Sequence, residues 1–386
     1  MNKTVYAKIN RGDAFGGLSL WLAVVLIYWT HALLLGQAIV VLFVIFHLLK
    51  SKLALRNLPV LTYQLMAASA VSFVLGAVVN GLVSVNSAQV TLFHFYFIIL
   101  FISLVRLDLQ SSDRQLLKFC YVFLVLNYIS LMLIHGFGLF EWMILDDSRG
   151  SVRYQFVFAE PSYLAIFSSV LIFLVLNVGC GGFAKLCMVF LLLVLVQMSN
   201  SASGFLLSTV CILFWAIKWP RRKSQIAYAF IALISLSIVV AAIFQNEFIK
   251  MRLEDIAFGR DASFFLRFIA PWMVADSVIS SLPLSGTGFG FLSDYLLRNY
   301  ADYQYLAKVN SYNEYIENTN IDSISAFIVS SYGLPVAAFV FFHLLRSAKL
   351  NGGVRNVFFV LIISFLMGSF VGPLFLGLVF LKSREP

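Results

Sequence analysis

Long runs of apolar residues recur along the whole chain, and they constrain its fold more than any other feature. A run of about 20 apolar residues can cross the hydrocarbon core of a bilayer as a helix. Charged residues, or clusters of Gly, Asn and Ser, separate one run from the next. The runs lie at about 16–31, 33–49, 59–79, 89–105, 117–138, 162–178, 184–199, 204–218, 225–245, 323–345 and 356–381.

Composition also indicates a membrane protein. Hydrophobic residues make up 61% of the chain, charged residues 12%, and the mean hydropathy is +0.92, unlike a soluble globular chain. The sequence predicts an all-α polytopic membrane protein with about 11–12 transmembrane helices.

Gly368, Gly372 and Pro373 make the last run either one kinked helix or a re-entrant pair. The four cysteines lie in or beside apolar runs and are predicted to be packing residues: Cys120, Cys180, Cys187 and Cys211.

Lysine and arginine gather in alternate loops, which assigns the sides of the membrane because basic loops stay in the cytoplasm. The N-terminus and the loop around Lys218–Lys223 fall on this side. The net charge of +9 therefore reflects topology, and no nucleic-acid partner is expected.

This map divides the chain into three parts. Residues 1–245 contain helices 1 to 9 with short loops and an outer loop near 139–161. Residues 246–322 form a long outer loop with amphipathic helices, and residues 323–386 contain the C-terminal spans. The predicted spans contain no Asp, Glu, Lys or Arg in their interiors, which disfavours an ion-coupled transporter. Function is expected in the two outer loops.

The first outer loop ends in SRGSVRYQFVFAEPSYLAIF, residues 148–167. Pro161 suits the first position of a helix, and Glu160 before it meets the helix dipole favourably. Alternatively, partial desolvation of this carboxylate by nearby aromatic rings would suit it to general-base catalysis. Arg149 and Arg153 are four positions apart, which places them on one face if the segment is helical. Paired arginines suit a diphosphate, although solvated loop charges explain them as well.

The second outer loop contains GRDASFFLRFIAPWMVADSVISSLPLSGTGFG, residues 259–290. Asp261 suits the N-cap of a helix lying along the membrane surface. Arg260 and Arg267 are seven positions apart and would point the same way on that helix, either towards a ligand or towards lipid phosphates. The glycines at 286, 288 and 290 allow a tight turn and close approach of a ligand to the backbone. They lack the strand and helix of a dinucleotide site.

Tyrosines and polar residues alternate after this helix. Aromatic faces beside amides and carboxylates suit a sugar chain, and anchoring at the membrane interface is the alternative. The candidate substrate-binding residues here are Asp294, Tyr295, Arg298, Tyr300 and Tyr303, with Arg149 from the first loop.

Two of these stretches are similar to a known family. Arg153 and Phe158-Ala159-Glu160-Pro161-Ser162 resemble the Arg…EPS element of Wzy-type polysaccharide polymerases, the O-antigen polymerases of Gram-negative bacteria. The later series resembles the long periplasmic loop of that family: Gly259-Arg260, Arg267, Trp272, Pro283-Leu284 and Gly286-x-Gly-x-Gly.

The resemblance implies a GT-C-like glycosyltransferase of the bacterial inner membrane, with a cytoplasmic N-terminus and a periplasmic active site. It would lengthen a glycan on undecaprenyl diphosphate without a metal, a nucleotide sugar or another cofactor. Arg153, Arg260 and Arg267 would neutralise the leaving diphosphate, and Glu160 would deprotonate the attacking hydroxyl or organise the arginines. Its expected partners are lipid-linked glycans, membrane lipids, a Wzz-type chain-length regulator and a Wzx-type flippase.

Three other functions are open. An O-antigen ligase would transfer a finished polymer to lipid A core and is expected to have a histidine in the large outer loop. The five histidines, His31, His47, His94, His135 and His343, all lie outside 246–322, which favours the polymerase. A polysaccharide or lipid exporter would show internal repeats or charges within the membrane. A structural scaffold would leave the outer arginines unexplained.

Overall fold

The computed structural model of the chain forms two compact units, each built from two separate segments. The first unit comprises Met1–Ile45 and Val105–Leu253, and the second comprises Phe46–Leu104 and Glu254–Pro386. The structure describes residues 42, 44, 45, 60–80, 88–93, 95–97, 99, 100, 103, 113–146, 152–156, 161–177, 182–217, 251, 254, 255, 258, 269–298 and 323–366.

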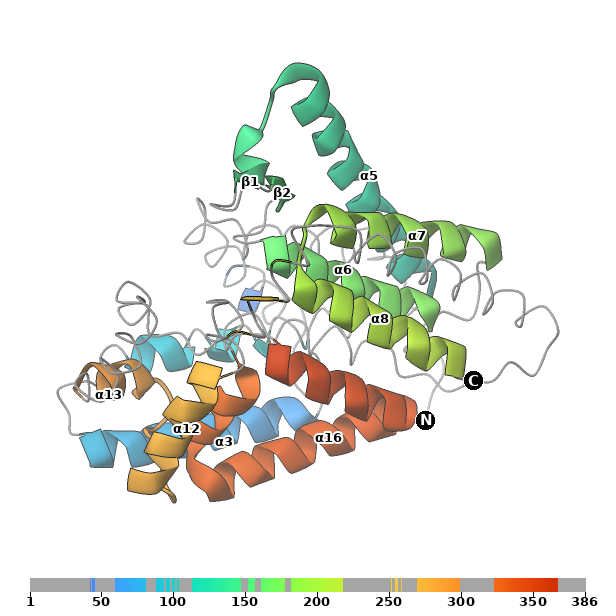
Figure 1. The fold of residues 1–386 in the computed structure, drawn as a ribbon. Helices are drawn as coiled ribbons and strands as arrows, with labels where there is room; N and C mark the ends of the chain where they lie inside the picture. The colour runs from blue at the N-terminus through green and yellow to red at the C-terminus, as the bar shows by residue number, and fades with distance from the viewer. Residues whose placement is uncertain are drawn as a thin grey trace. The chain divides into compact units, whose positions relative to one another are not determined.

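Helix α6 (Pro161–Leu176) lies at the centre of the first unit. It is apolar on every side, and 15 of its 16 residues are buried, as expected of a helix enclosed by others. Three helices contact it: α5 (Asp113–Phe137), α7 (Gly182–Met198) and α8 (Ala202–Ile217). Between α5 and α6 the chain forms the short helix η5 (Glu141–Met143) and a two-stranded hairpin, β1 (Ile144–Asp146) and β2 (Val152–Tyr154) (Figure 1).

The second unit contains α3 (Val60–Asn80), α12 (Ala270–Ser281), α13 (Leu292–Arg298) and α16 (Ile324–Leu366). Helix α16 folds back on itself. Ser325 Oγ lies 2.8 Å from Ser364 Oγ, whereas these residues would be about 58 Å apart in a straight helix. Figure 1 shows the two limbs, one orange and one red. Gly352 and Gly353 lie between the apolar parts Ile324–Leu350 and Asn356–Phe365.

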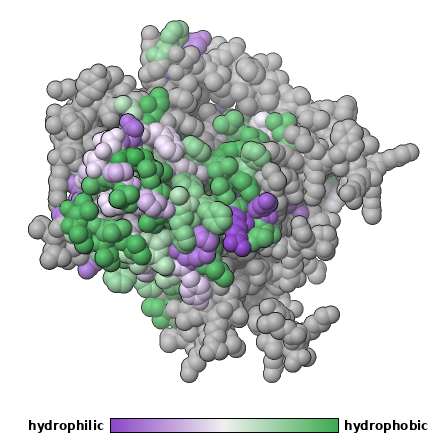
Figure 2. Space-filling model, turned by 90° about the horizontal axis from the view of Figure 1, so that it is seen from below, coloured by the Kyte–Doolittle hydropathy of each residue, from purple (hydrophilic) through white to green (hydrophobic). Residues whose placement is uncertain are grey.

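Among the described residues, three helices are long and apolar enough to cross a membrane: Val60–Asn80, Leu116–Phe137 and Ile324–Leu350. Large apolar side chains on the helices are exposed, such as Val78 at 78% and Met132 at 73%. Figure 2 shows broad hydrophobic areas on the described surface in one view. Exposed apolar surface of this extent is typical of a protein whose solvent is lipid. The described part of the chain is therefore an all-α membrane protein with almost no strand.

Helices are confirmed close to six of the predicted spans, those at 59–79, 117–138, 162–178, 184–199, 204–218 and 323–345. Helix α6 begins at Pro161, the position predicted for its start. Residues 346–355, expected as a connecting loop, are instead helical within α16. The predicted spans at 16–31, 33–49 and 225–245, and the break at Gly368–Pro373, lie outside the described residues or nearly so. Cys120 and Cys211 are buried and Cys187 half-buried, all three as free thiols, which confirms their packing role.

Candidate functional site

Arg153 lies on strand β2 of the first unit, opposite Leu145 of β1. Its side chain is half-buried, and its Nε donates a hydrogen bond to the main-chain oxygen of Ser199 at 3.2 Å. Arg153 is thus in an extended strand, so the helical arrangement considered for it and Arg149 does not apply to Arg153. The arginine contacts the turn between α7 and α8 instead.

That turn is built from small polar residues. Asn200 has a left-handed backbone (φ 46°), a conformation that asparagine tolerates better than most residues, and its side chain donates to Val152 O at 3.5 Å. Ser201 Oγ accepts the Gly204 N–H at 3.4 Å, which caps the start of α8. The turn therefore joins the hairpin to the beginning of α8.

Helices α6 and α8 run side by side in the same direction, with their N-termini together. A Cβ atom built on Gly204 would lie only 2.2 Å from the Ala165 Cβ. The main chain of α8 at Gly204 therefore packs directly against the side chain of Ala165 in α6. Ser169 Oγ donates to Gly204 O at 3.0 Å. Each helix N-terminus carries roughly half a positive charge. The N-terminus of α8 follows directly on the turn that Arg153 contacts, whereas α7 ends at the same turn and its C-terminus carries the opposite partial charge.

Tyr154, the next residue of β2, points to the opposite face and anchors the strand to α5. Its hydroxyl lies 3.1 Å from Ser130 Oγ and donates to Asn127 O at 3.2 Å. Its ring contacts Phe156, which in turn meets Phe123 edge-on at 6.4 Å. Burial raises the pKa of the Tyr154 hydroxyl. The group therefore stays protonated and able to donate at neutral pH.

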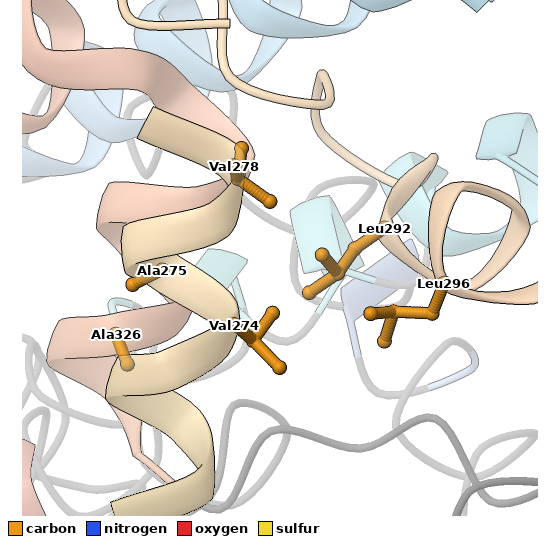
Figure 3. Packing of buried hydrophobic residues seen from close by; sticks show 6 residues of the cluster. All are labelled: Val274, Ala275, Val278, Leu292, Leu296 and Ala326. Atoms are coloured by element: carbon orange, nitrogen blue, oxygen red, sulfur yellow. The ribbon is translucent and has the colours of Figure 1, made fainter. Parts of the chain in front are cut away.

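Three further candidates lie on α13 of the second unit: Asp294, Tyr295 and Arg298. Figure 3 shows the packing beside them, in which Val274 and Val278 of α12 face Leu292 and Leu296 of α13. The half-buried Tyr295 ring packs against this cluster, and its hydroxyl lies 2.9 Å from Ser281 Oγ. Tyr295 thus takes part in the contact between α12 and α13, and its role in sugar binding stays a prediction.

The glycine series does not offer its backbone to a ligand in this structure. Residues 286–289 are buried. A Cβ atom on Gly288 would lie 2.1 Å from the Cα of Gly76 in α3, and one on Gly286 would lie 2.4 Å from Ser330 O in α16. The close backbone approach expected from the glycines is made to two helices of the same unit.

Six of the candidate residues lie outside the described residues: Arg149, Glu160, Arg260, Arg267, Tyr300 and Tyr303. In the described ranges, no three His, Cys, Asp or Glu residues form a group that could hold a metal ion. The turn at 199–201 and its contact with Arg153 are not among the features predicted from the sequence. The serines and asparagine of MSNSASG, residues 198–204, were the available signal, since these residues favour turns and helix starts.

Part of the chain matches a known protein family. Residues 187–341 match a family model, Wzy_C, described as O-antigen ligase. The match includes most of α7, all of α8, α12 and α13, and the start of α16, and it therefore contains the turn that Arg153 contacts. No curated protein and no solved structure matches the chain significantly. Over residues 187–341 the chain is similar to the O-antigen ligase superfamily, within which this match does not separate a ligase from a polymerase.

Proposed function

We propose that the chain is a membrane glycosyltransferase that polymerises undecaprenyl-diphosphate-linked repeat units into O-antigen or a related surface polysaccharide. The observation that carries the proposal is the match at residues 187–341, because it includes the turn at Ser199 that the Arg153 side chain contacts. We place the reaction on the periplasmic side of the inner membrane, in a GT-C-like architecture.

The proposed reaction moves a growing glycan from one lipid to another. The terminal sugar hydroxyl of a new lipid-linked repeat unit attacks the anomeric carbon of the growing chain, whose bond to the diphosphate oxygen breaks. Undecaprenyl diphosphate leaves with the bonding electron pair. The proton of the hydroxyl passes to a base, for which Glu160 is the candidate.

Arg153 is assigned to the leaving diphosphate. Its Nε donates to Ser199 O, which fixes the direction of the guanidinium. A positive group that is already in place where negative charge develops in the transition state lowers the activation barrier, because the site does not have to reorganise. Arg260 and Arg267 are proposed to share this role, and the α13 residues with Tyr300 and Tyr303 to hold the glycan.

A polymerase is preferred to a ligase because residues 246–322 contain no histidine. Deleting the gene and separating the surface polysaccharide on a gel distinguishes the candidates. A single repeat unit attached to the lipid core supports a polymerase, free lipid-linked polymer supports a ligase, and unexported units inside the cell support an exporter. A wild-type pattern would refute the proposal.

Point variants of the full chain then test the residues. At equal abundance in the membrane, Arg153→Ala is expected to lower polymer formation by about 100-fold, the loss typical for one group that stabilises transition-state charge. Arg153→Lys should recover little, since lysine lacks the Nε donor and the planar fork. Arg346→Ala, which removes an exposed arginine of α16, is the matched control and should keep polymerisation. Wild-type activity in Glu160→Gln would refute the role of Glu160.

A further inference from the structure

The main chain of residues 282–291 is inserted into a break in α16. Thr287 N donates to Ser330 O at 2.9 Å and Gly288 N to Ser331 O at 3.0 Å, while Leu334 N donates to Pro283 O at 2.9 Å. These bonds replace bonds that a continuous helix would make within itself.

The sequence of α16 explains why the break occurs there. Pro335 has no N–H, so the Ser331 carbonyl, four positions earlier, has no partner within the helix. Gly333 adopts a left-handed backbone (φ 70°), which glycine reaches without steric cost. The carbonyls left without helix partners are then paired by the inserted segment, as buried backbone groups must be.

Helix α3 holds the segment from another side, mainly through Ser72. The Ser72 hydroxyl donates to Ser331 O at 2.8 Å and accepts the Phe289 N–H at 2.9 Å. Asn80, the last residue of α3, donates to Thr287 O at 2.7 Å. The fully buried Ser72 side chain therefore links α3, α16 and the segment in one place.

The position of Ser72 along α3 shows how deep the segment reaches. Ser72 and Asn80 are eight positions apart, which is about 12 Å along a helix. The hydrocarbon core of a bilayer is about 30 Å thick, so the segment reaches well into the layer of the predicted span Val60–Asn80. Non-helical backbone is tolerated at such depth only where protein covers it and pairs it, and residues 286–289 are buried and hydrogen-bonded to α3 and α16.

The segment also fixes the place of α12. It follows α12 directly, because that helix ends at Ser281. Near the other end of α12, Trp272 packs against Phe365 of α16 with ring centroids 5.5 Å apart. Arg267 precedes Ala270, the first residue of α12, by three positions in the sequence.

We infer that residues 282–291 form a re-entrant segment, and that Ser72 is a positioning residue which sets the place of α12 through this segment. The effect of Ser72 on polymer formation, through the helix that follows Arg267 in the sequence, rests on the proposed polymerase function. The re-entrant segment itself does not depend on that function, and cysteine labelling and polymer formation test the two separately.

The first measurement is the reactivity of single cysteines in the full-length protein in its native membrane, after replacement of the four natural cysteines. A membrane-impermeant maleimide is the probe. Val152→Cys, in the outer hairpin of the first unit, should react rapidly, because Val152 is 59% exposed. Thr287→Cys should react far more slowly, because Thr287 is fully buried. Equal rates at the two positions would overturn the re-entrant segment.

The second measurement adds Ser72→Ala to the Thr287→Cys protein. Loss of a buried hydrogen bond should raise the labelling rate about tenfold. Ser69→Ala is the matched control, since Ser69 lies one turn away on α3 and its hydroxyl lies 2.6 Å from the Tyr332 hydroxyl, with no hydrogen bond to the segment among the described contacts. Equal effects of Ser72→Ala and Ser69→Ala on labelling would overturn the role of Ser72.

The third measurement is polymer formation at equal abundance in the membrane. Ser72→Ala is expected to lower it about tenfold, Ser72→Thr to restore it together with slow labelling of Thr287→Cys, and Ser69→Ala to leave it nearly unchanged. Rapid labelling with full polymerisation in Ser72→Ala would overturn the positioning role and leave the proposed function intact. If gene deletion does not change the polysaccharide, the proposed function and the effect of Ser72 on polymerisation fail together, whereas labelling still decides on the re-entrant segment.

Discussion

Glycine, alanine and serine determine how closely the helices of each unit approach. Gly204 and Ala165 let α6 and α8 touch, and Gly76 with Gly288 does the same for α3 and the re-entrant segment. Membrane helices associate through such small residues, because lipid is as apolar as a leucine side chain and gives no hydrophobic drive to associate. Buried serines such as Ser169 add hydrogen bonds between the helices.

Gly204→Ala is expected to destabilise the protein by about 1–3 kcal/mol, as overpacking typically does. The added methyl group would collide with the Ala165 side chain. The thermal stability of the purified full-length protein in detergent measures the effect. Ala165→Gly combined with Gly204→Ala should recover part of the loss, because it removes the colliding methyl group.

The matched control is Gly136→Ala in α5, where an added Cβ atom would meet nothing within 4 Å. This change should be neutral or slightly stabilising, since alanine is the better helix former. An equal loss of stability in Gly136→Ala and Gly204→Ala would contradict the packing argument.

The β-hairpin carries Arg153 and is held from both sides. Arg153 and Asn200 tie it to the turn between α7 and α8, and Tyr154 ties it to α5. The alternation of Val152, Tyr154 and Phe156 with polar residues is a strand signal, although three-residue strands are too short to be recognised among long apolar runs.

Tyr154→Phe should cost about 1 kcal/mol of stability, the usual net value of one buried hydrogen bond, and should lower polymer formation because it loosens the strand that holds Arg153. Tyr128→Phe is the control. The Tyr128 hydroxyl donates to Leu191 O at 3.0 Å. Tyr128→Phe therefore also removes a tyrosine hydroxyl, but one whose hydrogen bond joins α5 to α7. A similar loss of polymer in both variants, at equal abundance, would contradict a specific role for Tyr154.

Gly333→Ala tests the break in α16. Alanine at φ 70° is strained by about 1–3 kcal/mol, and its Cβ atom would lie 2.4 Å from Leu284 O. We therefore expect a lower melting temperature and faster maleimide labelling of Thr287→Cys. Leu334→Ala, which truncates a neighbouring side chain that is 47% exposed, should change neither measurement much. Unchanged labelling in Gly333→Ala would argue against a break that depends on glycine.

Neither compact unit is a continuous stretch of the chain. The parts predicted from the sequence, 1–245, 246–322 and 323–386, describe which residues cross the membrane and which form the long outer loop. The two compact units do not test that prediction. Their topology stays a prediction from the distribution of lysine and arginine.

Cysteine labelling tests that topology directly. With the outer membrane permeabilised, an impermeant maleimide should reach Val152→Cys, whose native side chain is 59% exposed. Lys349→Cys, at an exposed position of α16, should react only after the inner membrane is broken, since its loop is predicted to be cytoplasmic. Labelling of Lys349→Cys in intact spheroplasts would reverse this assignment.

The sequence by itself determined the membrane class, the positions of several helices and the start of α6 at Pro161, because apolar run length and proline act locally along the chain. It also singled out Arg153, although not its contact. Only the tertiary structure decided that Arg153 reaches Ser199, that Ser72 reaches Ser331 and that the glycines approach helices. These pairs join residues far apart in the sequence, and the period of an apolar pattern describes one helix or strand without naming the partner that it packs against.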